Sequence, residues 1–312
     1  MNKKKIIYIL GVERSGSTLL NIILGNDDHI ASFGELQYFP EAVLKNHMAY
    51  QDVNIKESIF WSNIINEFEV KFGTDIFLEY QNLRIKYERW RSIPMLLLHK
   101  LLKKKTLFSY WEYNDFLIDQ LQKRTNKEYV CDSSKNYPRY LALLLSNQYK
   151  FYPILIIRSV YGYVWSKKKH SINNGNSDKK QNLFKSIIFW NSDNLLFLII
   201  RLFNIKKIPI VKYEDFATTP ENTLNRLEQV FNLNLKSVKK HIKEKNIFTI
   251  KNTIAGNYSL RLKNKISIKL DNSWKVNLTL KEIITISILS FFLLKIINYE
   301  TYFKRPKSLE TI

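Results

Sequence analysis

An apolar run that leads directly into a glycine-bounded turn constrains the fold of this chain most. Residues 6–10 (IIYIL) have the length and composition of a buried strand, residues 11–16 (GVERSG) follow at once, and residues 17–24 (STLLNIIL) have helical apolar spacing. Between a strand and a helix, such a turn points successive backbone N–H groups inward, and the helix N-terminus adds its positive dipole end. The sequence therefore predicts a cradle for a phosphate or sulfate group rather than a plain Gly-Ser turn.

The loop departs from the Walker A pattern of nucleoside-triphosphate-binding proteins at one position. That pattern has a lysine where this chain has Ser17, so the cation that reaches the β- and γ-phosphates of a triphosphate is missing. Arg14 supplies a cation from a different direction, while Ser15, Gly16, Ser17 and Thr18 add backbone and hydroxyl donors. We therefore predict a loop for an anionic group other than Mg-ATP.

Apolar runs alternate with helical segments along much of the remaining chain. The predicted buried strands are residues 5–10, 129–131, 153–157 and 208–212, and the predicted helices are 17–24, 138–145 and 220–231. In the last of these helices, Leu224, Leu227 and Val230 share the face that we expect to be buried. This alternation is typical of an α/β fold, and we expect a P-loop-like, three-layer α/β/α domain with a central parallel sheet over residues 1–312.

Residues 45–125 interrupt the alternation. They are rich in aromatic and basic residues and contain many helix formers, so we predict a helical insertion that helps to shape the site beside the loop. Within it, residues 95–105 (MLLLHKLLKKK) form a basic amphipathic stretch. We interpret it as a helix with one apolar face and a solvated basic end, and peripheral contact with a membrane is the alternative.

The composition excludes several classes of protein. With 45% hydrophobic and 14% aromatic residues, a chain of 312 residues does not stay disordered, and 8 glycines with 7 prolines are too few for a collagen-like chain. The single cysteine, Cys131, excludes a disulfide framework and fits a reducing, cytoplasmic location. The net charge of +21 indicates an anionic partner, or a compositional bias that spreads lysine throughout the chain.

Two segments imitate targeting or membrane sequences. Residues 1–12 begin with lysines and an apolar run, but Glu13 and Arg14 follow without a small-residue cleavage site, so a buried first strand is predicted. Residues 283–297 (IITISILSFFLLKII) are shorter than the roughly 20 residues that a spanning helix needs and include Lys295. We therefore predict a buried core helix there and no transmembrane span.

The loop resembles a known family. Residues 11–20 (GVERSGSTLL) are similar to the 5′-phosphosulfate loop of sulfotransferases that use 3′-phosphoadenosine 5′-phosphosulfate (PAPS), in the arginine-containing form of the carbohydrate and tyrosylprotein branch. Four further stretches resemble segments of this family, in the family's order and over nearly the whole chain. They are residues 131–136 (CDSSKN), 156–166 (IIRSVYGYVWS), 212–221 (KYEDFATTPE) and 256–275, which contain the Gly-Asn pair, Arg261 and the Trp-Lys pair.

The resemblance implies a sulfotransferase that moves the sulfuryl group of PAPS, by in-line displacement, to a hydroxyl or amine of a carbohydrate or glycan precursor. It assigns the 3′-phosphate of the donor to Arg158 and Ser166. Arg14 and Lys135 are expected to neutralise charge on the group in flight. The family usually has a second arginine after Arg158, which residues 159–161 (SVY) lack. The spacing from the Gly-Asn pair to Arg261 is one residue longer than usual, so no donor contact is assigned to Arg261.

Glu35 is the first candidate for the general base. It follows the first helix after a short connection that can return it to the mouth of the loop, where a carboxylate can take the proton of an attacking hydroxyl, and the resemblance also implies a glutamate near this point. His29 is the alternative, because the cytosolic branch of the family uses histidine. Its neighbours Asp27 and Asp28 indicate a solvated turn.

Two other functions stay open on the sequence. The first is a P-loop nucleotide kinase, which the missing loop lysine disfavours. The second is a non-enzymatic basic protein that binds a polyanion, which would show steep salt dependence. The sulfotransferase scheme requires neither a metal nor nucleic acid, and the sequence has no His/Cys/Asp cluster with ligand spacing. The expected partners are PAPS and a hydroxyl-bearing acceptor.

Overall fold

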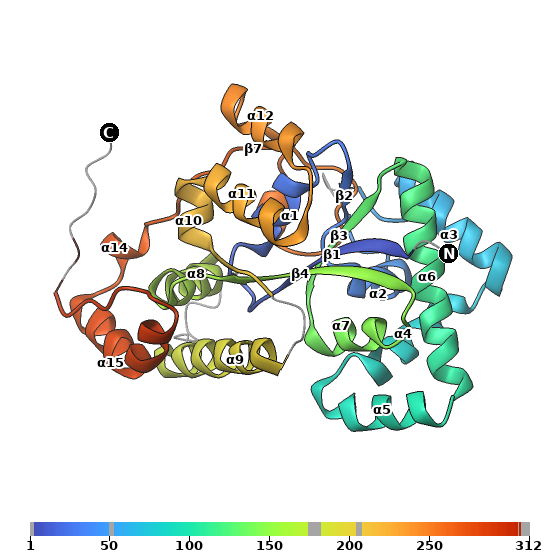
Figure 1. Ribbon diagram of the computed structural model, residues 1–312, viewed down its shortest axis with the longest axis horizontal. Helices are drawn as coiled ribbons and strands as arrows, with labels where there is room; N and C mark the ends of the chain where they lie inside the picture. The colour runs from blue at the N-terminus through green and yellow to red at the C-terminus, as the bar shows by residue number, and fades with distance from the viewer. Residues whose placement is uncertain (1–2, 50–52, 174–181, 204–207, 305, 307–312) are drawn as a thin grey trace. The chain divides into compact units, whose positions relative to one another are not determined.

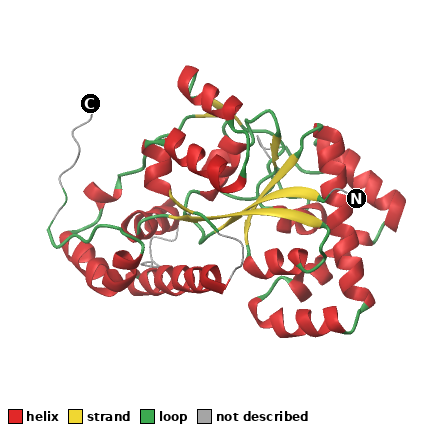
Figure 2. Ribbon diagram, in the orientation of Figure 1, coloured by secondary structure: helices red, strands yellow, loops and turns green. Residues whose placement is uncertain are grey.

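The computed structural model describes residues 3–49, 53–173, 182–203, 208–304 and 306, without the side chains of residues 173, 203, 258 and 261 (Figures 1 and 2). The chain forms two compact units built from alternating segments. Unit 1 comprises Met1–Leu10, Ser17–Ile154 and Leu227–Ile268. Unit 2 comprises Gly11–Gly16, Leu155–Arg226 and Lys269–Ile312. The single domain over residues 1–312 stays a prediction.

A five-stranded sheet with parallel pairings forms the centre of the fold, as predicted, in the order β2-β3-β1-β4-β5. Its strands are β1 (Lys4–Leu10), β2 (Ile30–Ser32), β3 (Tyr129–Lys135), β4 (Tyr149–Ile157) and β5 (Ile210–Lys212). In unit 1, Val130 of β3 pairs with Ile6 and Ala31, and in unit 2 Ile156 pairs with Val211. Because paired parallel strands point the same way, the residues that follow them lie at one edge within each unit.

Helices cover both faces of the strands. Helix α1 (Ser17–Leu24) packs against β1, β2 and β3 and is buried along its whole length. Figure 1 shows α1 above the strands and α7 (Tyr137–Leu144) below them. The other elements of unit 1 outside the insertion are η1 (Leu36–Tyr38), α2 (Phe39–Leu44), α12 (Lys236–Glu244), β6 (Phe248–Thr249), α13 (Tyr258–Arg261) and β7 (Lys265–Ile266). The layered α/β/α prediction is confirmed.

The insertion is helical, as predicted. Its elements are α3 (Ile59–Phe72), α4 (Ile76–Tyr87), η2 (Trp90–Ser92), α5 (Ile93–Leu101) and α6 (Lys105–Thr125). The one helix predicted over residues 95–105 is the end of α5 and the start of α6, because Lys103 between them has a left-handed backbone (φ 50°). On α5 only Leu96 is buried, while Leu98 and Leu101 are exposed, so its apolar face is largely open.

An aromatic cluster forms the core of the insertion. Phe68 on α3 is fully buried, and its ring centroid lies 4.8 Å from that of Phe116 and 5.5 Å from that of Phe77. Edge-to-face and tilted ring pairs of this kind stabilise a core beyond the burial of their area. The rings within 6.2 Å of Phe68 belong to Phe39, Phe72, Phe77, Tyr80 and Phe116.

Unit 2 is mainly helical outside β4 and β5. Its elements are α8 (Val160–Asn173), α9 (Leu183–Phe203), α10 (Tyr213–Thr218), the first part of α11 (Pro220–Phe231), α14 (Trp274–Asn277) and α15 (Leu280–Ile296). Helix α8 packs against α9, α14 and α15, and α15 also packs against α9. Tyr161 of α8 stacks on Trp274 of α14 with 4.8 Å between ring centroids.

Several elements differ from the sequence-based predictions. Strand β2 has only three residues, too few for a periodic signal. Helix α9 was not predicted, because its apolar residues lie on all sides and mask the helical period. Val230 is 42% exposed, which contradicts its predicted burial, because it lies in the last turn of α11. Helix α15 is buried along one face only, whereas a buried core helix was predicted.

One described helix, α9, is long and apolar enough to cross a membrane by length and composition alone. The stretch concerned is Leu183–Leu202, and 33% of its most apolar window is buried inside the protein. Length and composition alone do not show that the helix spans a membrane, so the absence of a spanning segment stays a prediction.

Replacement of Phe68 by alanine tests the aromatic core. Because the cavity would remove ring contacts on several sides, we expect the free energy of unfolding to fall by about 3–5 kcal/mol. Val70→Ala on the same helix is the matched control, since Val70 is 87% exposed, and should change it by less than about 0.5 kcal/mol. Urea denaturation followed by circular dichroism measures both values, and equal effects would contradict the assignment of this core.

Candidate active site

The predicted anion loop connects β1 to α1, and its two glycines cannot carry side chains. Gly11 and Gly16 have φ values of 143° and 94°, which L side chains rarely adopt. A Cβ atom on Gly11 would lie 2.4 Å from the carbonyl oxygen of Ile156, and one on Gly16 would lie 2.4 Å from the ring of Tyr213. The backbone of the loop therefore approaches the ends of β4 and β5 within unit 2 more closely than any other residue would permit.

The loop carries one buried hydroxyl that is not used within the described part of the protein. Among the described residues, the buried Oγ of Ser15 has no hydrogen-bond partner. Arg14 is half-buried with a left-handed backbone (φ 62°), and burial together with the Arg14 charge lowers the pKa of His170 on α8. Glu13 forms an ion pair with Lys167, also on α8. An unsatisfied buried hydroxyl is costly, which indicates that this loop is shaped for a ligand.

The loop continues into α1 through Ser17 and Thr18, which are both buried. Thr18 Oγ1 accepts a hydrogen bond from the backbone N–H of Asn257 (3.2 Å). A Cβ atom on Gly256 would lie 3.1 Å from Thr18 Oγ1 and 3.6 Å from Glu35 Oε1. The first turn of α1, the Gly-Asn pair and Glu35 therefore meet in unit 1, at the point where a short connection was expected to return Glu35.

Glu35 and Lys135 form an ion pair in unit 1. The side chains are 11% and 14% exposed, and Lys135 Nζ also donates to the carbonyl oxygen of Ser133 (3.3 Å). Glu35 is held by its backbone N–H, which donates to the carbonyl oxygen of Ile254 (3.0 Å). Glu35 follows β2 and Lys135 ends β3, so the parallel pairing of these strands brings together two residues that are 100 positions apart.

His29 lies apart from this pair. It precedes β2, whereas Glu35 follows it, so the two residues flank opposite ends of the strand. The side chain of His29 is exposed, and its backbone N–H donates to Asp27 Oδ1 (3.0 Å) in the turn. The expected solvated turn is found for His29 and Asp28, which are exposed, but Asp27 is buried and accepts a hydrogen bond from Ser237 (2.6 Å). The exposure of His29 favours Glu35 as the base.

Arg158 lies at the end of β4 in unit 2 and is 6% exposed. Its Nη2 lies 3.0 Å from Asp271 Oδ2, and its guanidinium carbon lies 4.5 Å from the centroid of the Tyr213 ring. A Cβ atom on Gly162 would lie 2.7 Å from Arg158 Nε, so the glycine makes room for the guanidinium on α8. Ser166, the predicted companion of Arg158, is half-buried farther along α8, and the contacts of Arg158 run to Asp271 and Tyr213 instead.

Two further properties make Arg158 a candidate anion site. Its buried Nε has no hydrogen-bond partner among the residues that the structure describes. Although burial raises the pKa of Asp271, a hydrogen bond from Ser273 and the charge of Arg158 lower that pKa below its ordinary value. Asp271 is therefore ionised at neutral pH, and its carboxylate occupies the place of an anionic ligand on the guanidinium. Asp271 has no motif of its own, so no sequence signal pointed to it.

Glu214 has a structural role in the segment after β4. Its Oε1 accepts from the backbone N–H of Ser159 (3.1 Å), and its Oε2 accepts from the Tyr299 hydroxyl (2.6 Å). Tyr299 also donates to the carbonyl oxygen of Ile157 (3.0 Å). Burial raises the pKa of Glu214. These contacts hold the segment after β4 that carries Arg158.

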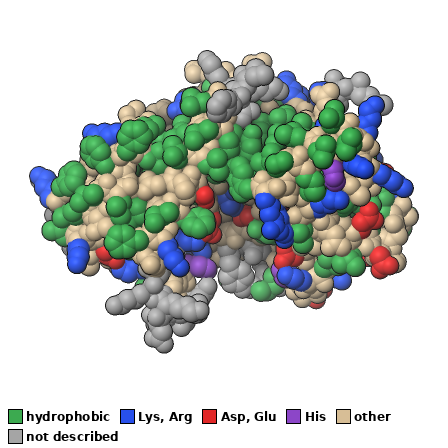
Figure 3. Space-filling model, turned by 90° about the horizontal axis from the view of Figure 1, so that it is seen from below, with side chains coloured by type: hydrophobic (Ala, Val, Ile, Leu, Met, Phe, Trp, Pro, Cys, Tyr) green, Lys and Arg blue, Asp and Glu red, His purple; other side chains and the backbone are tan. Residues whose placement is uncertain are grey.

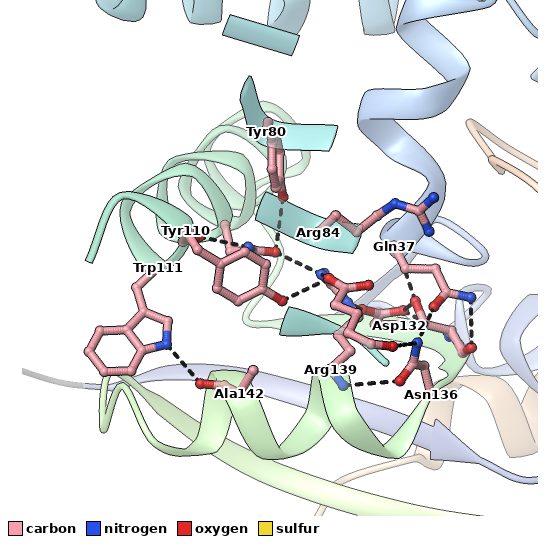
Figure 4. Close-up of polar contacts among 12 residues, drawn as sticks. Gln37, Tyr80, Arg84, Tyr110, Trp111, Asp132, Asn136, Arg139 and Ala142 are labelled. Carbon is pink, nitrogen blue, oxygen red and sulfur yellow. Dashed lines mark hydrogen bonds and ion pairs between the residues drawn. The ribbon is translucent and has the colours of Figure 1, made fainter. Parts of the chain in front are cut away.

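A second set of hydrogen bonds holds the segments on either side of the Glu35–Lys135 pair (Figure 4). Asp132 Oδ1 accepts from the backbone N–H of Ser134 (2.9 Å), and Ser134 Oγ accepts from the backbone N–H of Gln37 (3.1 Å). The Gln37 amide donates to the carbonyl oxygen of Ser134 (3.1 Å) and accepts from Asn136 (2.9 Å). These hydrogen bonds hold the end of β3 against the segment after Glu35.

Arg139 anchors this network and was missed by sequence reasoning. It is 1% exposed, and its guanidinium lies 2.7 Å from Glu88 Oε1 and 3.2 Å from Asp132 Oδ2. Its Nη1 also donates to Asn114 Oδ1 (2.8 Å), and Tyr110 donates to Glu88 (2.7 Å). Burial raises the pKa of Glu88. The only signal in the sequence is an arginine in the otherwise apolar helix at residues 138–145.

Within the part of the chain that the structure describes, no group of three or more His, Cys, Asp or Glu side chains is arranged to hold a metal ion.

Comparisons with known proteins agree with the fold. A family model with the description "Sulfotransferase family" matches residues 7–237. The sulfotransferase domain from the Synechococcus PCC 7002 olefin synthase is 17% identical, with a TM-score of 0.53 and 96% of each chain covered. The sulfotransferase domain from the curacin biosynthetic pathway is 17% identical, with a TM-score of 0.51, and covers 97% of this chain and 100% of its own. A comparison with curated protein sequences found no match.

Removal of the Arg139 side chain tests the buried network. Arg139→Ala leaves two buried carboxylates without their cation, so we expect the free energy of unfolding to fall by about 3–5 kcal/mol. The matched control is Arg124→Ala, because Arg124 forms an ion pair with Glu67 at 3.7 Å while both side chains are partly exposed. Arg124→Ala should lower the free energy of unfolding by less than about 1 kcal/mol. Urea denaturation of both variants measures the difference, and similar losses would mean that the buried charges are not coupled.

Proposed function

This chain belongs to the sulfotransferase family, and we propose that its sulfuryl donor is PAPS and that its acceptor is the hydroxyl of a carbohydrate or glycan precursor. Sulfuryl transfer itself follows from the family. The observation that carries the choice of donor is the pair of unpartnered buried groups in unit 2, Ser15 Oγ in the loop and Arg158 Nε after β4. Family membership disfavours both a nucleotide kinase and a non-enzymatic polyanion-binding protein, and the missing loop lysine further disfavours the kinase.

The residues present fit a donor with two anionic ends. The glycine-bounded loop, with Arg14 and Ser15, offers N–H, hydroxyl and guanidinium donors for the phosphosulfate end, and Ser17 and Thr18 extend it into α1. Arg158 offers a buried guanidinium for the 3′-phosphate, which distinguishes PAPS from ATP. When bound, PAPS supplies an activated sulfuryl group. We assign Ser166 to the same phosphate, as the family resemblance implies.

The remaining chemistry falls to residues of unit 1 and to Arg14. Glu35 is proposed to take the proton of the acceptor hydroxyl, because its carboxylate lies beside the first turn of α1 that ends the loop. Lys135 is proposed to orient Glu35 through their ion pair and, with Arg14, to stabilise negative charge during transfer. No metal is invoked. A cytoplasmic location stays a prediction from the single, buried Cys131.

Direct transfer of label tests the proposed function. The protein is incubated with PAPS that carries radioactive sulfur and with separate panels of glycans, lipids and peptides. We expect label on a carbohydrate hydroxyl. Label on a lipid or peptide alone would overturn the proposed acceptor, and turnover of Mg-ATP without transfer from PAPS would overturn the proposed donor.

The two anion motifs predict opposite effects of nearby substitutions on donor binding. Arg14→Ala and Arg158→Ala should abolish measurable binding of adenosine 3′,5′-bisphosphate, because each removes a guanidinium from the proposed site. Asp271→Asn should tighten it by about 3- to 10-fold, because the competing carboxylate loses its charge. The matched control is Arg226→Ala, in which an exposed arginine of unit 2 is removed. Calorimetry measures all four, and unchanged affinity in Arg158→Ala would contradict the assignment.

The general-base assignment predicts a separation of binding from turnover. Glu35→Gln keeps the shape of the side chain but cannot take a proton, so kcat should fall by about 100-fold or more while affinity for adenosine 3′,5′-bisphosphate stays within about twofold. Glu57→Gln, on an exposed turn, serves as the control. Near-normal turnover in Glu35→Gln would move the role to another group, and His29→Ala would then be compared.

A further inference from the structure

Helix α9 presents an apolar stripe to solvent. In most helices of a soluble protein the exposed stripe is polar, but here residues spaced by three, four or seven positions along the outer face are nearly all large and apolar. Phe184, Ile188 and Phe189 are 56–63% exposed, and Leu202 is 79% exposed. The exposed apolar residues of α9 are Phe184, Ile188, Phe189, Leu195, Leu196, Ile199 and Leu202.

Helix α15 extends this surface. It packs against α9, and the Asn191 amide of α9 donates to Ser290 Oγ (3.1 Å) and to the carbonyl oxygen of Leu289 (3.3 Å). The side chain of Phe292 on α15 is 76% exposed. The exposed apolar residues of α15 are Leu280, Ile288, Leu289, Phe291, Phe292 and Ile296. We call the exposed apolar residues of the two helices the α9–α15 face.

Figure 3 views the molecule from below and shows hydrophobic side chains on its left half, on the side where Figure 1 places α9 and α15, with lysine and arginine side chains among them. Many large exposed apolar side chains on two packed helices are unusual on a soluble monomer and indicate a site of interaction.

The opposite side of α9 prevents it from acting as a spanning helix in this fold. Trp190 is fully buried, and its Nε1 donates to the carbonyl oxygen of Arg158 (2.9 Å). Asn194 is also fully buried and bonds to the carbonyl oxygen of Trp190 (2.7 Å). Transfer of α9 across a bilayer would place this amide in hydrocarbon and remove the support of Arg158. The helix can therefore contact a membrane only through its outer face, with its axis parallel to the membrane surface.

The charges on the two helices indicate what covers this face. Lys185, Lys281 and Lys295 are exposed on α9 and α15. Neither acidic residue in the described part of these helices is exposed, since Asp193 is half-buried and Glu282 pairs with Lys168 (2.9 Å). An apolar face bordered by lysines without exposed carboxylates complements an anionic lipid surface, where the apolar side chains enter the acyl boundary and the ammonium groups meet the headgroups.

We infer that the α9–α15 face docks on the surface of an anionic lipid bilayer, with both helices in the plane of the interface. A second copy of the chain fits less well, because a two-fold interface places the same patch on both sides and would bring the lysines of the two copies together. The docking is independent of the proposed donor and acceptor.

Sedimentation with lipid vesicles tests this inference on the full chain without a donor. The wild-type protein should bind vesicles of equimolar phosphatidylglycerol and phosphatidylcholine. The double variant Phe189→Ser, Phe292→Ser should bind at least about tenfold more weakly, because two large side chains no longer enter the acyl boundary. The matched control is Ile59→Ser, Val70→Ser on α3, where residues that are 81% and 87% exposed are changed in the same way. It should bind as the wild type does.

A charge variant and a control for self-association complete the experiment. Lys281→Glu with Lys295→Glu should weaken binding by more than about tenfold, and the exposed pair Lys245→Glu, Lys263→Glu should have a smaller effect. Vesicles of phosphatidylcholine alone should bind the wild type weakly. The inference is overturned if the wild type does not bind anionic vesicles, or if the α9–α15 and control variants bind equally. It is also overturned if analytical ultracentrifugation shows a wild-type dimer that the double serine variant abolishes.

Discussion

A buried guanidinium between two carboxylates ties the helical insertion of unit 1 to the strand that ends in Lys135. Arg139 bonds to Glu88, which follows α4 of the insertion, and to Asp132 in β3. Glu88 Oε2 and Arg139 Nη2 have no hydrogen-bond partner among the described residues, but removal of one of the three buried charges would leave the others uncompensated. The position of Lys135, and through it that of Glu35, therefore depends on Arg139 and Glu88, which lie outside the loop and outside the family motifs.

Unit 2 also contains a buried arginine, but its carboxylate partner is partly exposed. Arg158 is held over the Tyr213 ring and above Gly162, and Asp271 balances its charge. The buried Arg139 network has both its carboxylates enclosed, whereas 40% of the Asp271 side chain is exposed. A guanidinium with an exposed counter-ion can exchange that ion for a ligand, while an enclosed one cannot. This difference distinguishes Arg158, which is proposed to bind the donor, from Arg139, which holds the segments around Lys135 in place.

The structure shows where several of the positively charged residues lie. Arg14 and Arg158 belong to the two candidate anion sites. Lys135 pairs with Glu35, the candidate base. Lys185, Lys281 and Lys295 lie on helices whose outward residues are apolar. The surplus of positive charge is therefore consistent with two kinds of anionic partner, a small donor in the loop and a lipid surface beside α9 and α15.

The sequence by itself determined the local elements whose signals are contained in a few consecutive residues. These are the strand–loop–helix unit at residues 6–24, the parallel α/β class, the helical insertion and the candidacy of Glu35 and Arg158. Only the tertiary structure decided which distant residues meet. The Glu35–Lys135 pair, the role of Arg139 and the Asp271 partner of Arg158 depend on strand order and helix packing. The exposed face of α9 depends on which side packs against α8 and α15. Such contacts join residues far apart in the chain, so no local pattern encodes them.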